Sequence, residues 1–439
     1  MEYNKEKILN KIDDKSAVVA VIGLGYVGLP LSLAFAEAGY KVIGIDNDKY
    51  KIESLLKNKQ SYIKHISQEK IKDIMKENCF DATVDLQQIS NADVIIICLP
   101  TPLNRYKEPD LSYVTNTMDS ILPYLKEGQI LSLESTTYPG TTEEELQTRI
   151  ENEGFIIGEN FFLVYSPERE DPGNLNFNTK TIPKVVGGIT TECLEVGIAI
   201  YGHIIEKIVP VSSTKAAELT KLLENIYRSV NIGLVNEMKI VADKMGIDIW
   251  EVINAASTKP FGFKAFYPGP GWGGHCIPID PFYLTWKAKE YNINTKFIEL
   301  SGELNTMMPQ WVVNKMMDAL NDKEKSLKNS NVLILGLAYK KNIDDTRESP
   351  SVKLMEVLHQ KGAIVHYADP FVSKFPKMRE HYFELEAIEV NKENLDKMDC
   401  VLISTSHDSF DYEFILNNSD LIVDTRGVYK EKYVNVIKA

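Results

Sequence analysis

Cys276 lies in a stretch of chain, residues 269–281, whose composition excludes a helix or a central strand. The stretch reads Gly-Pro-Gly-Trp-Gly-Gly-His-Cys-Ile-Pro-Ile-Asp-Pro, and glycine and proline both interrupt regular hydrogen-bond ladders. Glycines let a backbone approach a ligand closely, and prolines limit how far the loop relaxes. A cysteine is most often a small buried apolar residue. The Asp280 carboxylate follows four positions on. In this loop, and with a dinucleotide-binding pattern upstream in the chain, we favour a nucleophilic thiol.

A dinucleotide-binding pattern stands near the N-terminus. A β-rich apolar run over 17–22 leads into Gly23-Leu24-Gly25-Tyr26-Val27-Gly28, then a helical pattern, then a second β-rich run over 41–45 that ends in Asp46. These glycines allow a tight turn and close approach of a pyrophosphate at a helix N-terminus. A terminal acid that accepts hydrogen bonds from ribose hydroxyls favours NAD over NADP. The predicted NAD-binding residues here are Gly23, Gly25, Tyr26, Val27, Gly28 and Asp46.

Further parallel strands are expected over 93–99, 129–133 and 163–165, and polar residues follow each of them. Thr101 follows the first, Thr137 the second, and Glu168 with Arg169 the third. Ligands of open α/β sheets lie beyond the carboxyl ends of the strands, so the first two of these loops should border the cofactor. Glu168, in the third, is a candidate for positioning water or acting as a base. The two threonines could equally be turn or cap residues, and Glu168 a solvated loop residue.

A long helix is predicted over 213–246, where apolar residues recur at helical spacing. Serines at its start offer an N-cap, and Gly246 offers a C-terminal stop. Such a helix is suited to linking two domains and to pairing with a second subunit. Lys221 and Asn225 are four residues apart and share one face, although a lysine on its own is usually a solvated surface residue.

A second α/β unit is expected after the charged stretch 321–329. It starts with an apolar run over 331–339 and resembles the first unit without its full glycine pattern, which suggests a different nucleotide. Cations stand at its strand ends and could meet phosphate charge. We predict contacts with the substrate for Lys340 and Arg426 and a cofactor contact for Arg347.

Composition narrows the function further. The 439 residues carry a net charge of −13, which argues against nucleic acid or an anionic membrane as partner. The five cysteines form no CxxC pair and suit a reducing cytosol, with no metal site indicated. The N-terminus is polar, and the most apolar early stretch, 18–36, is interrupted by glycines and a proline, so we expect a cytoplasmic protein without a membrane span.

The predicted fold class is α/β. We expect two Rossmann-like, doubly wound parallel-sheet domains joined by a long central helix and a helical middle domain. The expected divisions are an NAD-binding domain over 1–210, a helical central and dimerisation domain with the cysteine loop over 211–322, and a substrate-binding domain over 323–439.

Four motifs in this order resemble the nucleotide-sugar 6-dehydrogenases of the UDP-glucose/UDP-N-acetylmannosamine dehydrogenase family. They are Gly23 to Pro30, Lys221 with Asn225, Gly273 to Asp280, and Lys340 to Ser349. The run Gly-His-Cys-Ile-Pro-Ile-Asp-Pro-Phe-Tyr-Leu-Thr-Trp-Lys-Ala and the motif over 166–173 look most like the UDP-N-acetylglucosamine enzymes. One feature departs from the family pattern. Many members carry, ahead of the cysteine loop, an arginine that reaches into the site of the partner subunit. In this chain the only cationic residues of the segment 259–264 are lysines.

The resemblance implies a four-electron oxidation of the sugar C6 alcohol to a carboxylate, with two NAD reduced. Cys276 would trap the aldehyde as a thiohemiacetal, which the second oxidation converts to a thioester for hydrolysis. Lys221 and Asn225 would stabilise the oxyanion, Asp280 would hold water or relay protons, and Thr137 and Glu168 would position water or substrate. His275 is given no role as a base. The substrate-binding residues implied are Glu168, Arg169, Lys221, Asn225, Phe266, Tyr267, Gly271, Gly274, Lys340 and Arg426.

Three alternatives stay open at this point. The same chemistry could act on UDP-glucose or UDP-N-acetylmannosamine. A two-electron hydroxyacid dehydrogenase on a related fold would need no thiol, and a non-catalytic NAD and UDP-sugar sensor would need neither Cys276 nor Lys221. We expect at least a homodimer, because a long central helix of this kind commonly pairs with a second copy.

Overall fold

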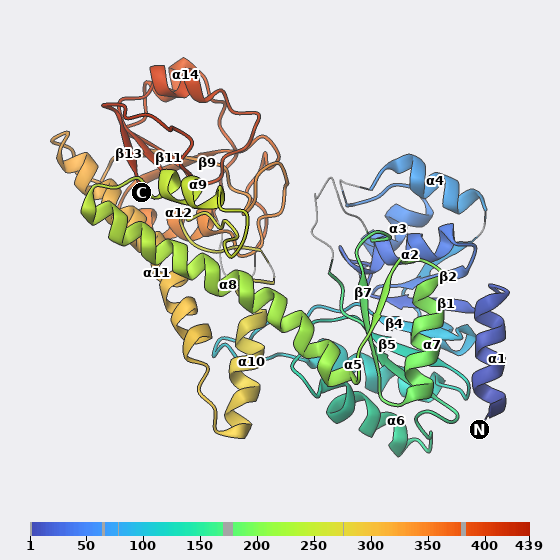
Figure 1. Ribbon diagram of the computed structural model, residues 1–439. Coiled ribbons are helices and arrows are strands. Elements are labelled where there is room, and N and C mark those ends of the chain that lie inside the picture. The colour runs from blue at the N-terminus through green and yellow to red at the C-terminus, as the bar shows by residue number, and fades with distance from the viewer. Residues whose placement is uncertain (1, 64–65, 78, 170–178, 275, 379–382) are drawn as a thin grey trace. The chain divides into compact units, whose positions relative to one another are not determined.

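The computed structural model describes residues 2–63, 66–77, 79–169, 179–274, 276–378 and 383–439. It divides into two compact units, one made of Met1–Glu224 with Trp286–Asn292 and the other of Asn225–Thr285 with Ile293–Ala439. The dividing line falls inside one long helix, α8 (Thr214–Met245), drawn in yellow-green in Figure 1. The expected division into three domains stays a prediction.

The first unit is built on a sheet with strand order β3-β2-β1-β4-β5-β6-β7-β8 among the described residues. Its first six positions have the Rossmann order of two mononucleotide-binding halves. The described strands pair in parallel except β6 with β7, which pair antiparallel. The strands are β1 (Val18–Ile22), β2 (Lys41–Ile45), β3 (Phe80–Thr83), β4 (Val94–Ile97), β5 (Ile130–Leu133), β6 (Phe162–Tyr165), β7 (Lys184–Gly188) and β8 (Ile208–Pro210).

Helices cover this sheet because its strands are apolar along their whole length. β4, β5 and β6 are buried at every position, as expected of strands covered on both faces. Helix α2 packs on β1 and β2, and α7 packs on β5 to β7 and carries α1 on its other side. The helices are α1 (Glu2–Asp13), α2 (Gly28–Glu37), α3 (Lys49–Leu56), α4 (Gln68–Lys76), α5 (Ser112–Ile121), α6 (Thr148–Asn152) and α7 (Thr191–Gly202).

The second unit holds a parallel sheet of order β10-β9-β11-β12-β13 in its described part. Alternate residues of β9 enter two separate cores, Val332 and Ile334 one, Leu333 and Leu335 the other. This sheet is therefore also covered on both faces, which confirms the predicted fold class. Its strands are β9 (Asn331–Leu335), β10 (Ile364–Ala368), β11 (Cys400–Ile403), β12 (Ile422–Asp424) and β13 (Val436–Lys438).

Helices before and between these strands complete the second unit. Helix α11 packs against α12 and contains Pro309 in its interior. The helices are α9 (Ile249–Ser257), α10 (Asp280–Ala288, which passes into the first unit at Trp286), α11 (Lys296–Asn321), α12 (Pro350–Gln360), α13 (Lys392–Leu395) and α14 (Tyr412–Asn417). No described helix of either unit is both long and apolar enough to cross a membrane.

The ends of α8 agree with the predicted signals. The Ser213 hydroxyl accepts a hydrogen bond from the Ala216 N–H at 3.2 Å, the geometry of an N-cap. After Met245 the chain turns at Gly246 with φ +72°, a left-handed conformation that glycine adopts without strain. The helix that carries Lys221 and Asn225 is thus bounded by its own sequence.

Candidate active site

The glycine-rich turn after β1 is closed by backbone contacts that only glycine allows. Gly23 has φ +93° and donates its N–H to the Ile45 carbonyl at 2.7 Å, and a Cβ there would lie 2.4 Å from the Cys98 oxygen. A Cβ on Gly28 would lie 1.9 Å from the Gly23 oxygen. At Gly25, in contrast, a Cβ would meet nothing within 4 Å. The turn is therefore packed on its inner side and open at Gly25, where a ligand can approach the backbone.

Asp46 is fixed at the end of β2 by three donors. One carboxylate oxygen accepts from the Leu24 N–H and from Lys51 Nζ, both at 2.8 Å, and the other accepts from the Asp48 N–H at 2.9 Å. The carboxylate is nearly buried. Its bond to Leu24 ties it to the glycine turn itself, so its position is set before any ligand binds.

The hydroxyls of Thr101 and Thr137 differ in their hydrogen bonding. The Thr101 hydroxyl donates to the Thr136 carbonyl at 2.7 Å, which is the turn role that the sequence left open for it. Thr137 is fully buried, and its hydroxyl has no hydrogen-bond partner among the described residues. Buried hydroxyls are normally satisfied, so Thr137 offers a donor and acceptor to a ligand at the end of β5.

Glu168 and Lys221 meet at the carboxyl end of β6. The backbone carbonyl of Glu168 accepts a hydrogen bond from Lys221 Nζ at 2.5 Å, and its side chain accepts from the Arg169 N–H at 2.7 Å. The Arg169 guanidinium donates to the Pro183 carbonyl at 2.6 Å and pairs with Glu224 at 2.5 Å. Arg169 therefore holds the loop after β6 against α8, and Lys221 is drawn to that strand end.

A buried ionic network lies behind Glu168. Lys184 Nζ is 2.7 Å from a Glu134 oxygen and 3.8 Å from a Glu168 oxygen, and the Tyr201 hydroxyl donates to Glu134 at 2.5 Å. Burial by itself would lower the pKa of Lys184, but the carboxylates of Glu134 and Glu168 raise it above its usual value. Sequence reasoning missed Lys184 and Glu134, whose signal is a charged residue at the end of a buried apolar strand.

In the second unit, Cys276 and Asp280 are joined through the start of α10. The Asp280 N–H donates to the Cys276 carbonyl at 2.9 Å. The Asn225 amide of α8 donates to the Asp280 carboxylate at 2.5 Å, while the Arg228 guanidinium donates to the Asn225 oxygen. Three residues predicted to be catalytic thus form one hydrogen-bonded group. The oxygen and nitrogen of the Asn225 amide are told apart by their partners, since the nitrogen donates to Asp280 and the oxygen accepts from Arg228.

The glycines of the cysteine loop lie against the loop that follows β9. Gly274 has φ +84°, its N–H donates to the Arg347 carbonyl at 3.0 Å, and a Cβ would lie 2.9 Å from the Tyr339 ring. Gly271 has φ +139°. The Arg347 guanidinium forms a bidentate pair with Asp345, at 2.6 Å for its shortest contact. The cofactor contact predicted for Arg347 is not tested by this arrangement and stays a prediction.

The remaining predicted substrate residues also lie in the second unit. Phe266 packs edge-on against Tyr227 at a ring distance of 5.7 Å, and the half-exposed Tyr267 donates its hydroxyl to Asn254 at 2.8 Å. Lys340 is half-buried after β9. Arg426 donates its Nε–H to the Ser404 carbonyl at 2.6 Å.

The structure therefore gathers the predicted residues into two sets, one in each unit. His275 and the part of the 166–173 motif from residue 170 on lie outside the described residues. The first set is Gly23, Gly25, Tyr26, Val27, Gly28, Asp46, Thr101, Thr137, Glu168, Arg169 and Lys221. The second set is Asn225, Phe266, Tyr267, Gly271, Gly274, Cys276, Asp280, Lys340, Arg347 and Arg426.

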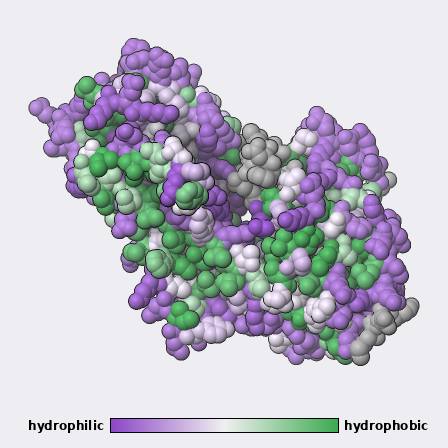
Figure 2. Space-filling model, viewed as in Figure 1, coloured by the Kyte–Doolittle hydropathy of each residue, from purple (hydrophilic) through white to green (hydrophobic). Residues whose placement is uncertain are grey.

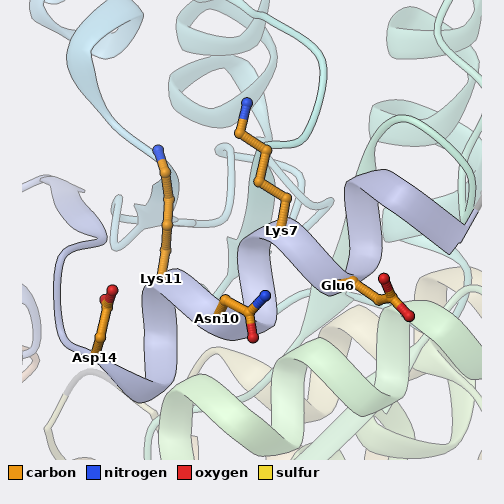
Figure 3. A pocket seen from close by; sticks show the side chains of 5 residues that line it. All are labelled: Glu6, Lys7, Asn10, Lys11 and Asp14. Carbon is orange, nitrogen blue, oxygen red and sulfur yellow. The ribbon is translucent and has the colours of Figure 1, made fainter.

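A hollow along α1 contributes nothing to either set. Figure 3 shows Lys7 and Lys11 extended away from the helix on one side and Glu6 on another. Lys11 already pairs with Asp93 at 2.7 Å. The lining side chains are Glu6, Lys7, Asn10, Lys11 and Asp14, none of which the sequence singled out.

The chain belongs to the UDP-glucose/GDP-mannose dehydrogenase family, whose three domain models all match it. The NAD-binding domain model matches residues 17–205, the central domain model 215–307, and the UDP-binding domain model 333–431. The protein is accordingly an NAD-dependent UDP-sugar dehydrogenase.

Individual relatives match over most of their length. A UDP-N-acetyl-D-mannosamine dehydrogenase from Methanococcus vannielii is 34% identical over 93% of this chain and 92% of its own. A UDP-N-acetyl-D-glucosamine 6-dehydrogenase from Pseudomonas aeruginosa is 36% identical over 84% of this chain and 86% of its own. The solved structure of a UDP-D-ManNAc dehydrogenase from Pyrococcus horikoshii matches with a TM-score of 0.85, at 29% identity, covering 96% of this chain and 98% of that one.

The residues of the first unit fit the NAD that this family uses. The turn is open at Gly25, the N-terminus of α2 follows it, and the Thr137 hydroxyl is buried without a partner among the described residues. Those three features would receive the pyrophosphate and the polar groups of a dinucleotide. Asp46 would hold the adenosine ribose.

Gly25→Val should weaken NAD binding without unfolding the protein. The added side chain enters open space in the free protein but occupies the path of the pyrophosphate, so we expect an affinity loss of about tenfold or more, about 1.4 kcal/mol. Gly202→Val is the matched control, because a Cβ there also meets nothing within 4 Å. Calorimetric NAD titration and thermal melting measure both effects. NAD affinity equal in the two variants would contradict the assignment of this turn.

Lys184→Met should destabilise the first unit strongly, because it leaves the Glu134 carboxylate buried without its cation. We expect a loss of about 3–5 kcal/mol in the free energy of unfolding, measured by urea denaturation, and a large recovery in the Lys184→Met, Glu134→Leu double variant. The control is Lys57→Met, since Lys57 pairs with Glu53 on the surface and its loss should cost about 0.5 kcal/mol. A double variant as unstable as the single one would refute the ion-pair account.

Proposed function

We propose that the protein oxidises the C6 alcohol of a UDP-N-acetylhexosamine to the carboxylate, with UDP-N-acetylglucosamine as the first choice of sugar. The observation that carries this proposal is the hydrogen-bonded group of Cys276, Asp280 and Asn225, which joins the glycine-rich cysteine loop to α8. A thiol is not needed to oxidise an alcohol to an aldehyde. It is needed to hold the aldehyde covalently so that a second oxidation can follow without release.

The residues supply each step of that chemistry. The Cys276 thiolate forms a C–S bond to the aldehyde carbon, and the carbonyl π electrons move to the oxygen to give a thiohemiacetal. Bound NAD⁺ supplies the hydride acceptor. Loss of the C6 hydrogen as hydride, together with the hydroxyl proton, leaves a thioester. Water then adds to its carbonyl, and the thiolate leaves as the carboxylate forms.

The residues assigned to stabilise the oxyanion in these steps lie on α8. Lys221 and Asn225 are one helical turn apart, and both carry N–H donors suited to an oxyanion. The Glu168 carbonyl holds the Lys221 ammonium, and Asp280 holds the Asn225 amide, so both donors are oriented in advance. We assign Asp280 the role of holding water or relaying protons, which its carboxylate chemistry suits; its backbone N–H donates to the Cys276 carbonyl and so keeps the two residues close together.

The choice among acetylated sugars rests on resemblance. The 36% identical Pseudomonas aeruginosa relative is named for UDP-N-acetyl-D-glucosamine, and the cysteine loop resembles the same group. UDP-N-acetylmannosamine is the second candidate, because the Methanococcus vannielii relative is named for it. The acid produced would supply a cytoplasmic pathway of surface polysaccharide or glycan synthesis.

NADH absorbance should rise by two equivalents per UDP-N-acetylglucosamine consumed, with UDP-glucose far slower. UDP-N-acetylmannosamine and UDP-N-acetylgalactosamine are the parallel substrates, and a preference for either would keep the mechanism and correct the sugar. One NADH per sugar would contradict the thioester route. Activity with none of the four would favour a sensor of UDP-sugars instead.

Cys276→Ser should lower turnover roughly a thousandfold or more, because the serine hydroxyl stays protonated at neutral pH and is a far weaker nucleophile than a thiolate. NAD binding should persist, as the first unit is unchanged. Cys79→Ser is the matched control, since Cys79 is a free, half-buried thiol before β3. Full turnover of the Cys276 variant would remove this residue from the mechanism.

We also propose that α8 pairs with α8 of a second copy. Large apolar side chains repeat along its exposed side at spacings of three, four and seven residues, as in the heptad pattern of paired helices. Figure 2 shows apolar residues gathered over this helix. The exposed apolar residues are Leu219, Leu223, Tyr227, Leu234, Met238, Val241 and Met245.

Leu234→Glu should shift the protein from dimer toward monomer, because the charge would be buried near the middle of the paired helices. Light scattering coupled to size-exclusion chromatography gives the mass directly. Lys7→Glu, on the exposed side of α1, is the control for a change of surface charge. A monomeric mass for the unaltered protein would refute this interface.

A further inference from the structure

Glu218 is a buried carboxylate on α8 that the mechanism proposed above does not use. It lies three residues before Lys221, and its side chain is fully buried. One of its oxygens accepts from the Gly140 N–H at 2.5 Å. The other accepts from the Thr142 N–H at 2.9 Å and from the Thr142 hydroxyl at 2.7 Å. These three hydrogen bonds hold the far end of the loop after β5 against α8.

The same loop has a second anchor near its start. The Thr101 hydroxyl donates to the Thr136 carbonyl at 2.7 Å. Between the two anchors stands Thr137, whose buried hydroxyl has no partner among the described residues. A buried hydroxyl is normally satisfied. A ligand group that meets Thr137 therefore depends on where the two anchors place this loop.

We infer that Glu218 is a positioning residue for NAD, which in its ionised form holds the loop after β5 so that the Thr137 hydroxyl meets the dinucleotide. Two of its three donors are backbone N–H groups, which cannot turn round to accept. An ionised carboxylate accepts from all three on its two oxygens, whereas a protonated carboxyl keeps one full acceptor oxygen. Loss of the charge therefore weakens the bond to one backbone N–H of the loop. The inference goes beyond the proposed function, because it concerns NAD and holds for any sugar.

The charged side chains around Glu218 are engaged with one another. Lys215, about one turn earlier on α8, pairs with Glu143. Lys287 of α10 pairs with Glu144 at 2.7 Å. Glu218 itself has no ion pair among the residues that the structure describes. Its charge is therefore balanced by N–H and O–H dipoles, and the loop is held only while that charge is present.

The ionisation of Glu218 changes near neutral pH. Burial raises the pKa of this carboxyl to about 7, against the lowering effect of the Gly140 and Thr142 donors. The ionised form is therefore nearly complete at a pH of about 8 and is lost as the pH falls through about 7. At a pH of about 6, roughly a tenth of the carboxyls stay ionised. If NAD requires the ionised form, its affinity should fall about tenfold between these two pH values.

A purely structural role for Glu218 makes a different prediction. A carboxyl whose pKa is higher in the folded protein than in the unfolded chain stabilises the fold as the pH falls. If Glu218 only supported the fold, acidification through this group would leave NAD affinity unchanged or raise it. If its charge places Thr137, NAD affinity falls although this group does not destabilise the protein.

The experiment is calorimetric titration of NAD into the unaltered protein, Glu218→Gln and Glu145→Gln, at pH values of about 6 and 8. Glutamine keeps the side chain's size but turns an amide N–H toward a backbone N–H of the loop. We expect Glu218→Gln to bind NAD about tenfold more weakly than the unaltered protein at the higher pH, with no further loss at the lower pH. Glu145, which pairs with Arg149 at the surface, is the matched control and should keep the tenfold pH dependence of the unaltered protein. A pH dependence that persists in Glu218→Gln would overturn the inference.

Proton release tests the inference without any variant. At a pH of about 6, binding of NAD to the ionised form should release close to one proton, and at a pH of about 8 close to none. Titrations in two buffers of different ionisation enthalpy measure that number. Zero release at the lower pH would overturn the inference.

Hydrogen exchange measured by mass spectrometry follows the loop in the absence of NAD. The backbone N–H groups of Gly140 and Thr142 should exchange about tenfold faster in Glu218→Gln at a pH of about 8, while Glu145→Gln should match the unaltered protein. Unchanged protection in Glu218→Gln would contradict the anchoring role. An unaltered protein that binds no NAD would overturn the assignment of the NAD-binding turn together with this inference. NAD affinity that ignores pH would overturn the inference alone.

Discussion

The hydrogen bond from the Asn225 amide to the Asp280 carboxylate ties α8 to the end of the cysteine loop. The same helix holds the loop's beginning, through the N–H and the carbonyl of Gly269. A loop of glycines loses about 1–2 kcal/mol of backbone entropy for each residue that is ordered, and it has little side-chain packing to offset that loss. Two anchors on one helix supply the order, so the position of Cys276 depends on α8 more than on the loop's own sequence.

Each unit contains a buried lysine, and the groups around the two ammonium groups differ. Lys184 faces Glu134 and Glu168, and the network neutralises it within the protein. Lys239 shares its surroundings with Arg426 and a carbonyl, and no described carboxylate neutralises it. The ion pairs of Lys184 support the carboxyl ends of β5 and β6. The surroundings of Lys239 contain no such pairing among the described residues.

Much of this fold was predictable because its signals are local. Continuous apolar runs marked the strands, and the four-residue spacing of Lys221 and Asn225 marked a shared face. Long-range contacts decided the rest. The antiparallel pairing of β7 with β6 joins Val164 with Gly188 and Tyr165 with Gly187, and no periodicity in the sequence shows it. Lys184 and Lys239 were missed for the same reason, since the groups they contact lie far away in the sequence.

The pair of Asp46 and Lys51 bears on how this protein can evolve. If Asp46 holds the adenosine ribose, as the sequence predicts, its carboxylate would repel an extra phosphate on that ribose. The cation that would welcome that phosphate is already in place, held 2.8 Å away by the very charge that excludes it. Loss of the acid would therefore both remove the barrier and release the ammonium. On this prediction, the preference for NAD over NADP would rest on the Asp46 side chain, and the cation able to bind the extra phosphate, Lys51, already lies beside it.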